Sequence, residues 1–204
     1  SYVSNYRIGA RTTIEQITAL QCREASTFGN GVRVATMNEC EGRAVKICDT
    51  MSAQVAYLMA LYRHRPLLIE RLEEAVEQVV DARRDILGTV GEDCFISGAR
   101  FLREVRIGNR VTIDGASALV NGTLLDDTKI GVDVKAYDFI ACEGSHMANG
   151  VTVERCFIGE SCILDKGFTA ADSLFFANSH CENGEAAAIF AGPYTVSHHK
   201  SSLL

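Results

Sequence analysis

The sequence predicts a mainly β protein, a parallel β-helix of hexapeptide coils with an inserted α-helical hairpin. Two observations lead to this fold class. A six-residue motif recurs along much of the 204-residue chain, with copies at 90–95, 107–112, 113–118, 119–124, 130–135, 158–163 and 164–169. Between about residues 49 and 87 the apolar residues change to helical spacing, which interrupts the repeat.

Each copy of the motif begins with an aliphatic residue, often followed by Gly, and has a small or β-branched residue at its fifth position. The fifth residue of one copy and the first of the next are two apart, so on a strand they share a face. Val111 and Ile113 are therefore expected to point inward, as are Ser117 and Leu119. Three such strands close one coil, with the Gly expected at a corner, and the coils stack around an apolar interior.

The cysteines follow the same register. The chain has eight, and no two of them form a C-x-x-C pair of the kind found in zinc ribbons. Cys94 and Cys162 occupy the small fifth position, and Cys156 lies two residues before the inward Ile158. We expect all three to be buried, unpaired thiols that serve as compact core residues.

The sequence divides into three stretches. Residues 1–48 are expected to form the first β-helix coils, 49–87 the helical hairpin, and 88–204 the continuing β-helix with a less regular end. Asp49 or Thr50 is suited to cap the first helix, and Pro66 fits the first turn of the second. Repeat character begins almost at residue 1 and neither end has an obvious cap, so we expect a fragment of a longer protein.

Composition excludes several classes of function. The formal net charge is -6 and no long run of Lys or Arg occurs, so nucleic-acid binding is not expected. No apolar run reaches membrane-spanning length, which argues against a membrane protein. The first residues lack the pattern of a secretory signal, so we expect a cytoplasmic location and reduced thiols.

The recurring Ile-Gly-x-x-Val unit resembles the repeats of the left-handed β-helix superfamily, across much of 1–48 and 88–170. That superfamily includes acyltransferases, sugar-nucleotide pyrophosphorylases and γ-class carbonic anhydrases. The resemblance implies a left-handed winding of the coils, against the right-handed rule that most parallel crossovers obey.

A narrower resemblance rests on three segments, 28–32, 52–64 and 175–201, the last of which ends in a distinctive His-His-Lys-Ser motif. They are similar to an uncharacterised bacterial hexapeptide-repeat family that is known as a domain of unknown function. Members of that family are longer than this chain. The family supplies no established catalytic residues that can be transferred to this sequence.

The acyltransferase resemblance suggests a transferase that moves an acyl group, with acyl-CoA as a possible donor, onto a small sugar or amine. His198 or His199 would act as general base, because β-helix acyltransferases use a histidine in that role. Alternation along a strand places these two side chains on opposite faces. Asn178, Glu185 and Lys200 are the candidates for binding the substrate, since polar residues concentrate there between apolar strands.

A second candidate site lies at the expected corner between the two helices. Arg63 and His64 are followed there by Arg65, and this group is suited to bind a phosphate-bearing substrate or cofactor. An ion pair that braces the hairpin is the structural alternative.

Two other functions stay open. A non-catalytic β-helix that serves as a scaffold or assembly protein fits the same repeat, because one scaffold hosts many activities. A metal site like that of γ-class carbonic anhydrases is the third reading, although the matching His spacing is missing and His180, Cys181 or Glu185 would have to contribute. Cys181 and His180 are unsuited to a catalytic dyad because neighbours on a strand point oppositely.

We predict a homo-oligomer, and a trimer in particular, with the helical hairpin near the subunit interface. Coils of this type often associate as trimers, and an apolar hairpin needs a surface to cover it. Light scattering should give about three times the mass of one chain. A monomer at high concentration would contradict this prediction.

Overall fold

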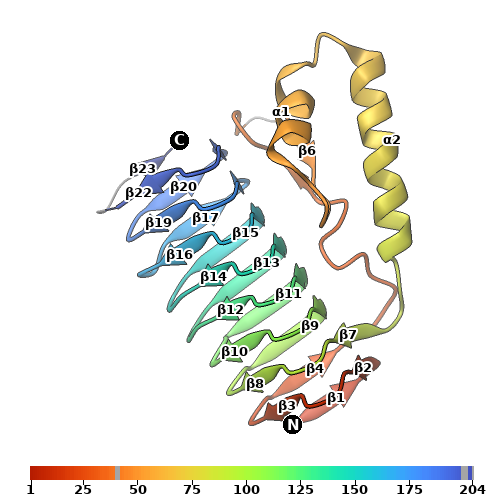
Figure 1. The fold of residues 1–204 in the computed structure, drawn as a ribbon, viewed down its shortest axis with the longest axis vertical. Helices are drawn as coiled ribbons and strands as arrows, with labels where there is room; N and C mark the ends of the chain where they lie inside the picture. The colour runs from red at the N-terminus through yellow and green to blue at the C-terminus, as the bar shows by residue number, and fades with distance from the viewer. Residues whose placement is uncertain (40–41, 199–201, 204) are drawn as a thin grey trace.

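The computed structural model describes residues 1–39, 42–198 and 202–203, and it confirms a mainly parallel β-helix with a helical insertion (Figure 1). The coils stack from the N-terminal end to the C-terminal end as a straight column, and the insertion lies along one side of it. The strands of the column are β1 (Tyr2–Ser4), β2 (Tyr6–Ile8), β3 (Thr13–Glu15), β4 (Ala19–Gln21), β7 (Gly88–Val90), β8 (Phe95–Ser97), β9 (Phe101–Ile107), β10 (Thr112–Asp114), β11 (Ala118–Leu124), β12 (Lys129–Ile130), β13 (Lys135–Ala141), β14 (His146–Met147), β15 (Thr152–Ile158), β16 (Ile163–Asp165), β17 (Thr169–Ala171), β18 (Leu174–Phe175), β19 (His180–Glu182), β20 (Glu185–Ala187), β21 (Phe190–Ala191), β22 (Val196–Ser197) and β23 (Ser202–Leu203).

One coil contains 17 residues through the middle of the column, one residue fewer than three complete hexads. Thr112 pairs with Lys129, and Ala118 with Lys135, in parallel register. The shortening occurs inside the longest strands, where a single left-handed residue such as Asn121 (φ 49°) forms a corner. Asn and Asp tolerate this conformation better than most residues. The left-handed winding of the whole column stays a prediction.

The interior follows the predicted register. Ile107, Ile113 and Leu119 are buried, but Ala116 occupies the inward position that the hexad assigned to Ser117, which is half-buried. Gly115 has a positive φ angle and forms a corner, so the inward-facing position after it comes one residue earlier than the hexad predicts. The seven cysteines that the structure describes are buried and free, which confirms the prediction for Cys94, Cys156 and Cys162.

The glycines that follow the aliphatic residues lie where a side chain would be crowded, as expected. Gly91 and Gly108 do not have positive φ angles. Instead, a Cβ atom added at Gly91 would lie 2.4 Å from the carbonyl oxygen of Gly108 in the next coil. The backbones of successive coils approach closely there, and no side chain fits between them. Glycine is therefore required at these positions.

The insertion leaves the column between Gln21 and Gly88. In the next coil a single corner residue, Glu104, stands at the position where the insertion departs. The coil strand before the insertion and the one after it still pair with each other, as Thr13 does with Phe95. An antiparallel bridge between Ser26 and Asp85 closes its neck. The column is therefore continuous through the insertion point.

The first part of the insertion was expected to belong to the coils, and it does not form coil strands. Its two strands, β5 (Arg33–Val34) and β6 (Val45–Lys46), pair with each other in antiparallel register. Val32 and Val34 alternate with polar residues as a hexad would. Alternation is shared by every half-buried strand, so it did not distinguish a coil from a hairpin.

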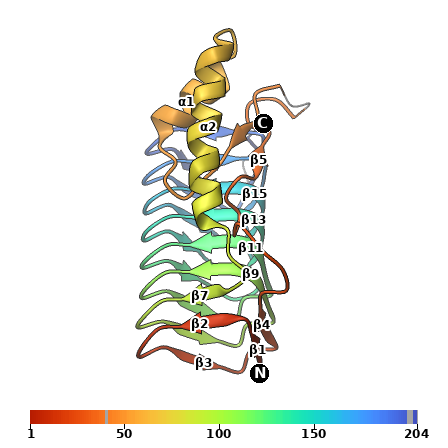
Figure 2. The same cartoon turned by 90° about the vertical axis from the view of Figure 1, so that its right-hand side faces the viewer.

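The segment 23–37 runs along the column beside the corners of successive coils (Figure 2). The backbone N–H of Gly29 donates to Asn121 Oδ1 at 2.9 Å, and that of Ala35 donates to Asp172 Oδ1 at 3.3 Å. Asn30 connects this segment to the rest of the insertion, because its Oδ1 accepts from the backbone N–H of Asp49 at 2.8 Å. Buried polar groups are thus satisfied where the insertion meets the coils.

Two helices complete the insertion, α1 (Ala53–Leu61) and α2 (Pro66–Arg83). Ser52 caps α1, in place of the expected Asp49 or Thr50, by accepting from the backbone N–H of Val55. Pro66 is the first residue of α2, as predicted. In the described part of the chain no helix is long and apolar enough to span a membrane.

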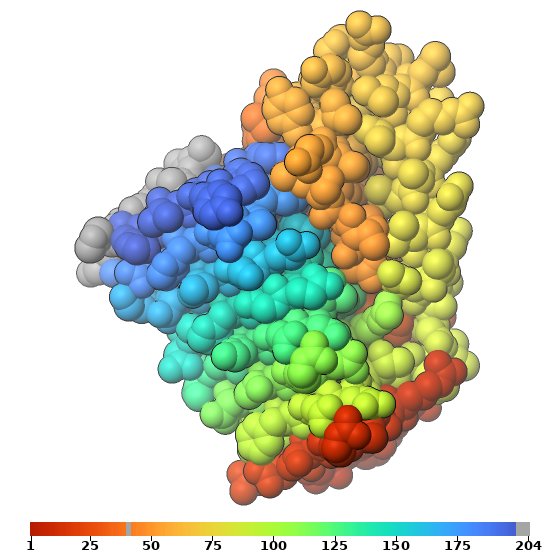
Figure 3. All heavy atoms as spheres, in the orientation of Figure 1, coloured from red at the N-terminus to blue at the C-terminus, as the bar shows by residue number. Residues whose placement is uncertain are grey.

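The helices cover an apolar area on the outside of the coils, and Figure 3 shows the insertion packed against the side of the column. Met59, Val76 and Val80 belong to one buried cluster with side chains that point outward from the coils. Those coil side chains are Ile140, Cys142, Phe157, Leu174 and Phe176. Both faces of these strands are buried, which explains the uninterrupted apolar runs at 139–142 and 174–176.

We predict that Gly29→Ala weakens the attachment of the insertion. Gly29 has a φ angle of 82°, and an added Cβ would lie 2.4 Å from the carbonyl oxygen of Phe139. Left-handed strain and overpacking together should lower the free energy of unfolding by about 2–4 kcal/mol. Urea denaturation measures it, and Gly192→Ala is the control because its added Cβ meets no atom within 4 Å. Equal midpoints for both variants would contradict the prediction.

Candidate functional site

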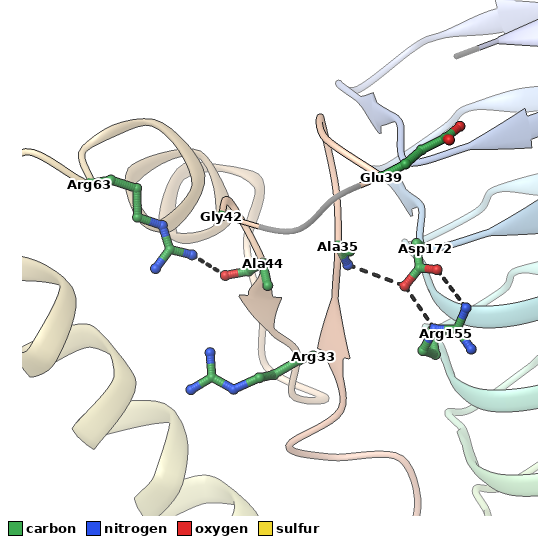
Figure 4. A pocket seen from close by; sticks show the side chains of 8 residues that line it. All are labelled: Arg33, Ala35, Glu39, Gly42, Ala44, Arg63, Arg155 and Asp172. Carbon is green, nitrogen blue, oxygen red and sulfur yellow. Dashed lines mark hydrogen bonds and ion pairs between the residues drawn. The ribbon is translucent and has the colours of Figure 1, made fainter.

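A cavity of about 620 Å³ lies where β5, β6 and the helix–helix corner face the coils (Figure 4). The insertion supplies most of its wall, and the corner column of the coils supplies the rest. Its lining residues are Arg33, Ala35, Glu39, Gly42, Ala44, Arg63, Arg155 and Asp172. Its lining contains three arginines and two carboxylates, Glu39 and Asp172.

Arg33 and Arg63 share a single carboxylate. Arg33 donates to both oxygens of Glu73, at 3.1 and 3.3 Å, while Nη1 of Arg63 lies 4.0 Å from Glu73 Oε1. Arg63 Nη2 also donates to the carbonyl oxygen of Ala44. Two cations on one anion leave a local excess of positive charge.

Within the described residues, Arg63 has one hydrogen-bond donor without a partner. Its Nε–H is buried and has no hydrogen-bond acceptor among the residues that the structure describes. Burial lowers the pKa of the Arg63 guanidinium, and the neighbouring Arg33 charge lowers it further, although Glu73 acts in the opposite direction. A buried donor without an acceptor is unfavourable, and an anion in the cavity would relieve it.

Arg155 has a structural role on the other side of this cavity. Its guanidinium donates to both oxygens of Asp172, at 2.8 and 2.6 Å, and it also contacts Glu154. Since Asp172 accepts from Ala35 as well, this pair connects β5 to the coils. Two carboxylates already neutralise Arg155, so it adds little to the attraction of an anion.

His64 follows Arg63 in sequence but lies in a different place. Its ring stacks on Tyr62, with 5.5 Å between the centroids, at the tip of the hairpin. A separate cavity of about 440 Å³ there is lined by Tyr62, His64, Arg65, Pro66, Leu67 and Leu68. The structure therefore does not bring the predicted pair Arg63 and His64 into one site.

His198 belongs to a polar cluster on the outer face of the coils near the C-terminal end. Its ring lies 4.7 Å from that of His180, and both histidines have a ring nitrogen 3.9 Å from a carboxylate oxygen of Glu182. Lys166 Nζ lies 2.7 Å from Glu182 Oε2. The neighbouring Ser197 is buried, so the strand alternates there as predicted.

The other predicted residues of that region lie on the surface of the coils. Asn178 is exposed at a corner with a φ angle of 60°, and Glu185 is exposed on β20 beside Thr169. Neither residue lines the arginine cavity. His199 and Lys200 lie outside the described residues.

Cys181 and His180 do not form a nucleophilic pair. Cys181 is fully buried inside the coils, and burial raises the pKa of its thiol to about 11. His180 points to the outside of the same strand, where it meets His198. Within residues 1–39 and 42–198, no group of three or more His, Cys, Asp or Glu side chains is arranged to hold a metal ion.

Comparison with known proteins gives the family. The family described as "Domain of unknown function (DUF4954)" matches residues 1–204. This chain belongs to that family. An uncharacterized protein of Treponema pallidum (strain Nichols) is 29% identical over 171 residues, which cover 76% of this chain and 22% of that relative. No solved structure matches.

In this DUF4954 chain, Lys166 is predicted to control the ionisation of Glu182. Its ammonium, and more weakly the imidazoles of His198 and His180, holds the pKa of the Glu182 carboxyl below its ordinary value of 4.5. Lys166→Met should therefore raise that pKa, as measured by NMR titration of the glutamate carboxyl carbons. The exposed Lys129, on the same sheet, supplies the control Lys129→Met.

The sign of the stability effect follows from this depressed pKa. The interaction contributes stability that is fully present above the unfolded-state pKa of Glu182 and is lost as the pH falls through the folded-state value. The stability difference between the native protein and Lys166→Met should thus be constant near pH 7 and shrink below about pH 4.5. A difference independent of pH would refute this assignment.

Proposed function

We propose that this chain is a transferase-like protein that binds a phosphate-bearing small molecule, such as an acyl-CoA donor, in the arginine cavity. One observation carries the proposal, the buried Nε–H of Arg63 that lacks an acceptor among the described residues. The planar guanidinium of arginine matches the geometry of a phosphate oxygen pair. A phosphate in the cavity would accept from this donor.

The charge around Arg63 supports an anionic ligand. Glu73 is shared with Arg33, so one positive charge is left over between these three side chains. The cavity is also partly enclosed by β5 and β6, and a less hydrated cation attracts an anion more strongly than one in open water. An acyl-CoA, with several phosphates, is the donor class that the superfamily resemblance suggests.

His198 is the residue that we propose as general base toward a small sugar or amine. The carboxylate of Glu182 faces its Nδ1 at 3.9 Å and is suited to orient the ring. His198 does not line the arginine cavity of its own chain. Catalysis would therefore require a second subunit to bring one chain's donor next to another chain's base, which agrees with the proposed trimer.

A scaffold or assembly role is the second candidate function, and the hairpin tip favours it. Leu67 is 75% exposed there, and Tyr57 and Tyr62 are exposed beside it. An apolar group of this kind is more typical of a contact surface than of a solvated loop. A scaffold needs no ligand in the arginine cavity, which separates the two functions experimentally.

We predict that coenzyme A binds the purified chain and that Arg63→Gln weakens this binding at least about tenfold, the usual range for losing a charged hydrogen bond. Isothermal titration calorimetry measures the affinity. Arg71→Gln is the matched control, because Arg71 is an exposed residue that forms an ion pair with Glu74 on the same helix and does not line the cavity. Equal binding by both variants would refute the cavity as the site, and no binding of coenzyme A or phosphate would favour the scaffold.

A further inference from the structure

A second cavity of about 380 Å³ lies between the segment that leads into α1 and the coils. It shares no lining residue with the arginine cavity. Its lining residues are Asp49, Thr50, Met51, Ser52, Ala53, Gln54, Cys142, Glu143, Phe157, Gly159, Glu160, Phe176, Ala177 and Pro193. Three of them are acidic, whereas none is basic.

Asp49 is the buried acid of this cavity. Its side chain is only 2% exposed, and Oδ2 accepts from Arg83 Nε at 2.6 Å and lies 3.5 Å from Arg106 Nη1. The other oxygen, Oδ1, is buried and has no hydrogen-bond donor among the residues that the structure describes. Such a lone carboxylate oxygen requires a partner that the described part of the chain does not supply.

Glu143 and Glu160 provide the remaining acidic charge. They occupy equivalent positions in adjacent coils and are both exposed. Within the described residues, no ion pair or side-chain hydrogen bond involves either carboxylate. Like charges on adjacent coils repel each other, and a cation between them would remove that repulsion.

The fields of the three acids meet inside the cavity. Burial raises the pKa of the Cys142 thiol well above its ordinary value, and the charges of Glu143, Glu160 and Asp49 raise it further. The N-terminus of α1 also lies in the wall and carries roughly half a positive charge. Arg83 and Arg106 already pair with Asp49, so the negative charge of the cavity comes from Glu143 and Glu160. These two glutamates carry more charge than the helix terminus, so their end of the cavity favours a cation.

The rest of the wall is apolar. Phe157 and Phe176 are buried, with 5.4 Å between their ring centroids, and Met51 lies beside the acidic residues. A fully hydrated ion gains nothing from such a wall. An ammonium group attached to an apolar body would meet the carboxylates with its charge and the rings with its body.

We propose that this cavity binds an organic cation, a primary amine with an apolar body. The ammonium would lie between Glu143 and Glu160, within reach of the free oxygen of Asp49, and the apolar body would pack on Phe157 and Phe176. This inference does not rest on the proposed function of the arginine cavity.

The test titrates the full chain with 2-phenylethylamine and follows binding by isothermal titration calorimetry. Two probes of the same shape serve as comparisons, the neutral 2-phenylethanol and the anion phenylacetate. The amine should bind saturably at millimolar concentration or below, and more tightly than either. Absence of amine binding, equal binding of the alcohol, or tighter binding of phenylacetate would each overturn the proposal, the last because the α1 terminus would then dominate.

Variants locate the site. Glu143→Gln and Glu160→Gln should each weaken amine binding about 5- to 10-fold by loss of one nearby charge. Glu70→Gln is the control, since Glu70 is an exposed acid on α2 and does not line the cavity. Arg63→Gln should leave amine binding unchanged, which separates this site from the arginine cavity. An unchanged affinity in both cavity variants would overturn the assignment.

Discussion

The structure depends on one contact, the seating of the segment around Gly29 against the corner column of the coils. Gly29 lies so close to the Phe139 carbonyl that no side chain fits, and Asn121 binds its backbone N–H. This contact fixes the path of the insertion, and the apolar cluster with Phe157 and Leu174 forms behind it. Both cavities exist only because the insertion is held there, since each has one wall from the coils and one from the insertion.

The two cavities have opposite electrostatic character. One holds Arg33 and Arg63 with a shared Glu73, whereas the other holds Glu143 and Glu160 without a cationic partner in the described chain. A chain with net charge -6 would not attract an anion by its overall field. The arginine cavity must therefore act locally, through a buried donor, while the acidic cavity acts with the overall field of the protein.

The sequence predicted the parts of the fold that depend on periodicity. Inward Ile113 and the buried cysteines followed from residues two apart sharing a face. The same rule placed Ser197 and His198 on opposite faces, but it did not say which of the two points outward. Periodicity carries no information about which strands pair, so it predicts coil strands where the structure has the antiparallel β5–β6 pair. It also could not separate Arg63 from His64, because the chain turns between them. The uninterrupted apolar run 139–142 indicates a strand that is buried on both faces. It could have predicted that another part of the chain covers the outside of the coils there.

The corner where the insertion departs has a consequence for protein engineering. The insertion between Gln21 and Gly88 replaces one corner residue of the coils with more than sixty residues. Thr13, before the insertion, still pairs with Phe95, after it. Gly167 forms another corner, and a side chain added there would meet no atom within 4 Å. A foreign loop or small domain grafted at Gly167 should thus be carried outside the column without breaking its ladder of hydrogen bonds.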